Sequence, residues 1–169
     1  LGRSIVNAPE FDKYSNLTES SFFKLPETTP ITRSLLEDHL SSFLEKAFRK
    51  PVSQDVMGRY ISYLESELKN GKPFKDSMKK LITAIISSPR FFYISEQKNS
   101  SLKTQPLSPY EMATRLSFFL WSSIPDDELL RVARDGTILN PKIYESQVAR
   151  LLESPKSKSI AENFARQWL

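Results

Sequence analysis

The chain has 169 residues, of which 39% are hydrophobic and 26% are charged, and its formal net charge is +4. It contains no cysteine and one histidine, which excludes disulfides, thiolate metal sites, a cysteine nucleophile, covalent attachment of a c-type haem and any site built from two histidines. The four glycines argue against a glycine-rich phosphate loop and an open all-β fold, while the apolar share is sufficient for a packed core.

Residues 1–30 are predicted to form an irregular strap. The segment contains three prolines and scattered asparagine, serine and threonine, so no regular element is expected there. It also carries aromatic residues that would pack on a folded domain: Phe11, Tyr14, Phe22 and Phe23. We therefore expect an ordered strap and not a free linker.

A first helix is predicted from Thr32, where apolar residues begin to recur at the helical period, to Phe48. Pro51 stops this helix. Ser53 is a suitable cap for a second helix, because its side-chain oxygen can accept a hydrogen bond from the first turn. Gly71 ends the second helix, since glycine adopts the left-handed conformation at low cost.

A third helix is predicted to open at Pro73 and to end before Pro89. Residues 90–94 read Arg-Phe-Phe-Tyr-Ile and are compatible with a short helix or with an extended segment. Together these elements predict a helical module over residues 31–96. The polar stretch 97–107 is the predicted linker to the next module.

A second helical module is predicted over residues 108–169. Its first helix starts strongly, because Ser108 can cap it, Pro109 fills the first helical position and Glu111 completes a capping box. The helix runs to about Ser122 and is apolar on more than one face, which predicts a central, buried helix. Three further helix starts contain a proline: Pro125, Pro141 and Pro155.

The sequence as a whole predicts an all-α fold of two consecutive small helical bundles with the irregular N-terminal strap. No strand-like alternation of useful length and no internal repeat is visible. Most of the eleven prolines then act as helix openers and stops, and they are not a sign of disorder.

Basic residues exceed acidic ones only in the middle of the chain, by thirteen to eight over residues 31–105. The densest part of this excess is a run of lysines: Lys69, Lys72, Lys75, Lys79 and Lys80. Arginine is sparse there and a single aromatic residue, Phe74, lies among the lysines, so a solvated helix face is favoured over a nucleic-acid surface. No nucleic-acid partner is expected, and no apolar run approaches the ~20 residues of a transmembrane helix.

His39 lies on the first predicted helix beside acidic residues. A general base or metal ligand at this position would need partners from elsewhere in the fold, and the sequence offers no second histidine. A histidine at the helix surface or at the boundary of the core is therefore the favoured interpretation, and no metal site is expected.

The densest acidic cluster is the run Asp126, Asp127 and Glu128. Paired carboxylates can serve acid–base chemistry or bind calcium, but this run lacks the glycine and the spaced oxygen ligands of a calcium loop. Its position directly after Pro125 at a helix start favours helix capping and interaction with the helix dipole.

Arg115 is the one interior charge of the predicted central helix. A buried guanidinium must be paired or hydrogen-bonded, so we expect a structural pair with a carboxylate or with carbonyl oxygens. Anion recognition is the functional alternative. The sequence does not choose among the candidate carboxylates: Glu128, Asp135, Glu145 and Glu162.

Three aromatic residues of the second module are candidates for the core or for a docking surface: Phe119, Trp121 and Trp168. Aromatic residues at helical spacing most often belong to the core, which is the favoured interpretation. No nucleophile elbow, phosphate loop, haem-attachment motif or metalloprotease motif is present. No catalytic residue is therefore assigned.

Two pairs of segments resemble the landmarks of known helical modules. Residues 46–52 and 88–93 resemble the paired landmarks of one module, and residues 107–131 with 162–169 resemble the module that follows it. Both modules are domains of unknown function in large multidomain proteins typical of planctomycetes and related bacteria. Those proteins often carry a cytochrome-c-like domain near the N-terminus.

The resemblance implies an exported protein whose partners include other domains of the same polypeptide, with a possible c-type haem in the parent but no cofactor in this chain. It also implies a piece of a longer protein that begins after the upstream domains and stops inside the second module. Three functions are compatible with it: a non-catalytic scaffold or binding module, a docking part of a c-type cytochrome electron-transfer protein, or a portion of a polysaccharide-active enzyme. The ligand is not specified.

Overall fold

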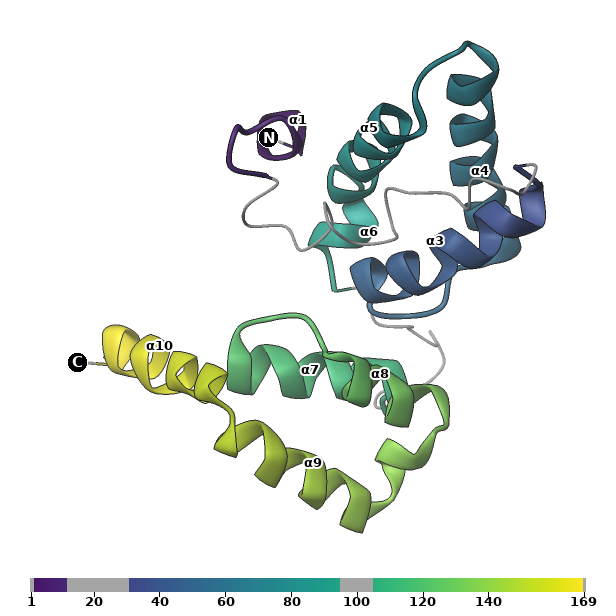
Figure 1. Ribbon diagram of the computed structural model, residues 1–169. Helices are drawn as coiled ribbons and strands as arrows, with labels where there is room; N and C mark the ends of the chain where they lie inside the picture. The colour runs from purple at the N-terminus through teal and green to yellow at the C-terminus, as the bar shows by residue number, and fades with distance from the viewer. Residues whose placement is uncertain (1, 12–30, 95–104, 169) are drawn as a thin grey trace. The chain divides into compact units, whose positions relative to one another are not determined.

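The computed structural model describes residues 2–11, 31–94 and 105–168, and in these ranges every regular element is helical (Figure 1). Side chains are described for 4–11, 31–94 and 105–163. The predicted all-α fold is thus confirmed. The chain divides into two compact units, Leu1–Ile94 and Ser95–Leu169, and each is described by itself.

Unit 1 is built from five helices in the described residues: α1 (Gly2–Val6), α3 (Arg33–Phe48), α4 (Gln54–Lys69), α5 (Phe74–Ile86) and α6 (Pro89–Phe92). Helix α5 lies against both α1 and α4, and α3 packs on α4, α5 and α6 (Figure 1). The core is aliphatic and fully buried at its centre: Leu36, Leu40, Leu44, Ile61, Leu64, Met78, Leu81 and Ile85.

The predicted N-terminal strap contains a regular piece. Helix α1 lies within it, and Val6 of α1 belongs to the core of unit 1. Phe11 packs against the same core, as expected for an ordered strap. Residues 12–30, with three of the four aromatic residues predicted to pack, lie outside the described residues.

The ends of the unit 1 helices follow the residues that the sequence singled out. The side chains of Thr32 and Ser53 cap α3 and α4, accepting hydrogen bonds from backbone N–H groups in the first turn. Gly71 has a φ of 72°, the left-handed conformation expected of a helix terminator. Residues 90–94, which the sequence left undecided, form the end of α6 and an extended exit at Tyr93.

Unit 2 contains four α-helices and two 3₁₀ turns in the described residues: α7 (Pro109–Trp121), α8 (Asp127–Arg134), η2 (Thr137–Leu139), α9 (Pro141–Glu153), η3 (Pro155–Ser157) and α10 (Lys158–Trp168). Helix α7 packs against α8, α9, α10 and both turns, so it is central to this unit as predicted (Figure 1). Pro155 opens the turn η3 instead of a helix, and α10 begins three residues later.

The predicted capping box at the start of α7 is present. The Ser108 side chain accepts a hydrogen bond from the Glu111 backbone N–H at 3.3 Å, and the Glu111 carboxylate accepts one from the Ser108 N–H at 2.8 Å. Two backbone donors that have no partner inside the helix are therefore satisfied.

Ser108→Ala is expected to lower the free energy of unfolding by about 1 kcal/mol, because the N-cap acceptor is lost from the central helix of unit 2. Urea denaturation followed by circular dichroism measures the change, with Ser108→Asp as the control that keeps a capping oxygen. An unchanged midpoint for the alanine variant would contradict the role of the cap.

Candidate functional site

Arg115 is not the buried charge that the sequence predicted. It is exposed on α7, on the face opposite the core residues Ala113, Leu116 and Leu120. The expectation was wrong because the apolar character of α7 on several faces was taken to bury the whole helix. Among the carboxylates proposed as its partners, Glu128 and Asp135 bind Arg131 instead.

The aromatic residues of α7 separate into a core residue and a surface residue. Trp121 is 6% exposed and belongs to the core of unit 2, whereas Phe119 is 70% exposed. Phe119 follows Arg115 by four residues, so the two lie on the same helix face. The side chain of Trp168, the third candidate, lies outside the residues described.

Trp121 joins α7 to α9 and to the turn that follows it. Its indole Nε1 donates a hydrogen bond to the Leu151 carbonyl at 2.8 Å, 30 residues further along the chain. The Lys156 ammonium and the Arg150 guanidinium lie 4.9 Å and 5.8 Å from the ring centre. These distances are typical of cation–π contacts, so the ring is held by packing, a hydrogen bond and two cations.

Arg150 connects this tryptophan to the acidic cluster. Its two terminal nitrogens donate to the Asp126 carboxylate at 2.6 Å and 3.1 Å, and Asp126 also accepts from the Leu129 backbone N–H at 2.9 Å. Burial raises the pKa of Asp126, but the hydrogen bonds from Arg150 and Leu129 outweigh it and leave the pKa below its ordinary value. The capping interpretation of Asp126 is confirmed.

A buried arginine does occur, at Arg49 in unit 1, a residue that the sequence analysis did not single out. Arg49 is 5% exposed, and its guanidinium donates to three carbonyls at the end of α6: to Phe91 at 2.9 Å and to Arg90 and Tyr93 at 3.1 Å each. It also donates to the Ala47 carbonyl at 3.4 Å. Burial lowers the pKa of Arg49 from its ordinary value. We call this set of hydrogen bonds the Arg49 clamp.

The Arg49 clamp connects the two landmark segments of unit 1. Residues 46–52 supply the arginine and residues 88–93 supply the three carbonyls, although about 40 residues separate them. Arg49 has a φ of 60°, a left-handed conformation that costs an L-residue about 1–2 kcal/mol. The guanidinium hydrogen bonds offset that cost, because carbonyls at a helix end lack partners within the helix. The sequence analysis missed this contact, and the pairing of the two motifs was the one signal that pointed to these segments.

An exposed apolar surface lies directly at the clamp. Phe92, Tyr93 and Ile94 are 57%, 72% and 47% exposed, and we call these three residues the α6 platform. The neighbouring Phe91 packs against the core of unit 1, with its ring in edge contact with Phe92. The α6 platform is thus held in place by Phe91, which packs against the core of unit 1, and by the Arg49 clamp.

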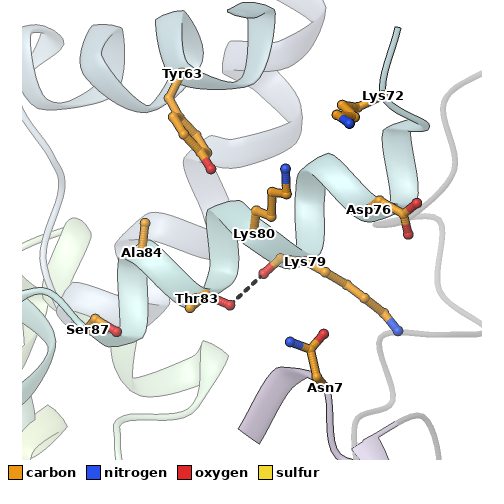
Figure 2. A pocket seen from close by; sticks show the side chains of 9 residues that line it. All are labelled: Asn7, Tyr63, Lys72, Asp76, Lys79, Lys80, Thr83, Ala84 and Ser87. Carbon is orange, nitrogen blue, oxygen red and sulfur yellow. Dashed lines mark hydrogen bonds between the residues drawn. The ribbon is translucent and has the colours of Figure 1, made fainter. Parts of the chain in front are cut away.

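A second surface feature of unit 1 is a groove along α5, with a volume of about 740 Å³, which we call the α5 groove. Figure 2 shows its lining residues, which come from α5, from α4 and the loop that follows it, and from the segment after α1. They are polar or small apart from one tyrosine: Asn7, Tyr63, Lys72, Asp76, Lys79, Lys80, Thr83, Ala84 and Ser87.

His39 is half-buried on α3, at the boundary of the core, with its ring 5.8 Å from that of Phe74. The part of the chain that the structure describes holds no group of three histidine, aspartate or glutamate residues arranged to bind a metal ion. Within the same ranges, no helix combines the length and apolar character that crossing a membrane requires. A covalently bound c-type haem does not fit this chain, because it has no cysteine.

The two units are small all-α domains of consecutive helices. Residues 36–96 match the family model PSD5, described as a protein of unknown function (DUF1595), and residues 107–169 match PSD4, described as a protein of unknown function (DUF1592). Two consecutive parts of the chain are therefore each similar to one of these domain types. No curated protein and no solved structure matches this chain.

Proposed function

We propose that this chain is a non-catalytic helical binding module of a larger exported protein, and that the α6 platform docks a protein partner. The observation that carries the proposal is the Arg49 clamp together with the exposed aromatic residues that it fixes. The buried guanidinium of Arg49 donates hydrogen bonds to carbonyls at the end of the four-residue helix α6. The side chains of Phe92 in that helix and of Tyr93 directly after it are exposed to solvent.

Rigid exposed aromatic residues suit a protein interface. Consecutive large apolar side chains on a surface mark interaction sites more often than scattered ones do. Phenylalanine and tyrosine are enriched at the centres of interfaces, where a few anchors supply most of the binding energy. Because Phe92 and Tyr93 already sit on an ordered helix end, little conformational entropy is lost when they are covered.

The charged residues near the α6 platform indicate the charge expected on the partner's surface. Arg90 within α6 and Lys50 after the clamp residue are both exposed. Charges at the rim of an interface steer association with a surface of opposite sign. We therefore expect an apolar patch with an acidic rim on another domain of the same polypeptide.

A haem domain is the alternative partner that the family resemblance suggests, and the chain would then be the docking part of a c-type cytochrome electron-transfer protein. The α6 platform is the docking surface in both cases. The two functions are therefore distinguished by whether the bound domain shows haem absorbance. A portion of a polysaccharide-active enzyme is less well supported. Glycoside hydrolysis requires two carboxylates, and Asp76 is the one carboxylate among the described residues that line the α5 groove.

The test titrates the separately expressed neighbouring domains of the parent polypeptide into this chain by isothermal calorimetry. Phe92→Ser/Tyr93→Ser is expected to weaken binding by about tenfold or more, because two anchors are removed. Ile31→Ser is the control, because Ile31 is 49% exposed in the same unit but lies outside the platform. Equal affinities for the double variant and the control would overturn the proposal, as would the absence of any binding.

A further inference from the structure

The turn between α4 and α5, residues 70–73, contains the only asparagine of the chain that is followed by glycine. Asn70 and Gly71 are both exposed to solvent, directly after the end of α4 (Figure 1). Among the residues that the structure describes, none is hydrogen-bonded to the Asn70 carboxamide. Gly71 has open space where a side chain would begin, so nothing in the described residues crowds the peptide bond between the two.

We propose that Asn70 is a site of spontaneous deamidation, with water as the only co-reactant. The Gly71 backbone nitrogen attacks the carboxamide carbon of Asn70, and a five-membered succinimide forms as ammonia leaves with the proton of that nitrogen. Water then adds to one of the two imide carbonyls, breaks its bond to nitrogen and returns a proton to the nitrogen. The products are aspartate and isoaspartate at position 70. Glycine favours the first step because it has no Cβ to hinder the attacking nitrogen.

The folded turn holds the two reacting atoms apart. The Asn70 ψ of 12° places the Gly71 nitrogen nearly eclipsed with the Asn70 nitrogen and turned away from the Cβ, whereas the succinimide ring requires it beside the Cβ. The Gly71 N–H also donates a hydrogen bond to the Leu68 carbonyl at 3.0 Å. Deamidation therefore requires the end of α4 to open first.

This opening involves a small part of unit 1. Three backbone hydrogen bonds close the turn, donated by Asn70 to Ser66, by Gly71 to Leu68 and by Lys72 to Glu67. Residues 69–73 are all exposed, so no core side chain has to leave its place. Because helix ends fray at low free energy, the rate of deamidation is set by local opening and not by unfolding of the whole unit.

The products change the end of α4 in two ways. Both carry a carboxylate in place of the amide, and a negative charge is unfavourable at the C-terminal end of a helix. Isoaspartate also adds a methylene to the backbone, so the hydrogen bonds donated by Gly71 and Lys72 cannot both keep their geometry. Glu67 accepts one of these bonds and forms an ion pair with Lys80 of α5, so the change reaches the contact between the two helices.

The test incubates the purified chain at mildly alkaline pH and maps its peptides by mass spectrometry. Replacement of the amide NH2 by OH is expected at Asn70 about tenfold faster than at Asn7, which is also exposed but precedes alanine. Asn140 is expected to stay intact, because the proline after it has no N–H. Isoaspartate is detected with S-adenosylmethionine and an isoaspartate-specific methyltransferase. Asn70→Gln is expected to abolish this methylation, whereas Asn7→Gln is the matched control that keeps it.

Urea distinguishes local opening from unfolding of the whole unit. Below the unfolding transition the rate is expected to change little with urea, because opening of one turn exposes little surface, whereas a route through global unfolding would accelerate steeply. The folded chain is expected to react about tenfold more slowly than the chain unfolded in concentrated urea. The proposal is overturned if Asn70 stays intact in the folded chain while the unfolded chain reacts, or if the rate follows global unfolding. Equal rates in the folded and unfolded chain would contradict the need for opening.

Discussion

Trp121→Ala is expected to lower the free energy of unfolding of unit 2 by about 3–5 kcal/mol, as for other large aromatic residues removed from a core. Three losses contribute to this effect. The ring leaves a cavity among the core residues of α7, α8 and α9, and the Leu151 carbonyl loses its indole donor. Arg150 and Lys156 also lose the aromatic face that they contact.

Phe119→Ala is the matched control for this prediction. It removes an aromatic ring from the same helix, two residues away, but that ring is 70% exposed. A surface substitution of this kind changes stability by about 0.5 kcal/mol or less. Differential scanning calorimetry measures both variants and can resolve the transitions of the two units. Similar losses for the two variants would contradict the assignment of Trp121 to the core and of Phe119 to the surface.

Trp121 and Phe119 also show which features of α7 could be predicted from the sequence and which could not. The capping box, the proline openers and the period of Ala113, Leu116 and Leu120 predicted the start, length and central position of α7, because these are local properties of one helix. The same period places Arg115 and Phe119 on the opposite face, and a strict use of it would have avoided the error of a buried Arg115. The partner of Trp121, a carbonyl 30 residues away, depends on how α9 packs and has no local signal.

Arg49 illustrates the same limit at the candidate site. A cation in the last turn of a predicted helix is explained by the helix dipole alone, so the residue did not stand out. Its acceptors are backbone carbonyls at positions 90, 91 and 93, and a carbonyl carries no side-chain identity that a sequence can display. The exposure of Phe92 and Tyr93 also depends on how α6 packs in the folded unit, because the neighbouring Phe91 packs against the core while these two side chains do not.

Arg49→Ala is expected to destabilise unit 1 by about 3 kcal/mol, because it leaves carbonyls of α6 without their donors in a partly buried position. Arg49→Lys is expected to recover part of the loss, since a single ammonium cannot reach the acceptors that the planar guanidinium spans. Hydrogen exchange of the Phe91 and Tyr93 amides, which close α6 through hydrogen bonds to Ser88 and Pro89, should accelerate in the alanine variant.

Arg49→Gly separates the clamp from the backbone strain at this position. Glycine also lacks the guanidinium, but it adopts a φ of 60° without the clash that a Cβ causes. The glycine variant is therefore expected to be about 1 kcal/mol more stable than the alanine variant and still well below the natural protein. Lys50→Ala, at the exposed neighbouring cation, is expected to change stability by about 0.5 kcal/mol or less. If Arg49→Gly were as stable as the natural protein, the clamp would do no more than offset the backbone strain of about 1–2 kcal/mol, and the larger loss expected for Arg49→Ala would be contradicted.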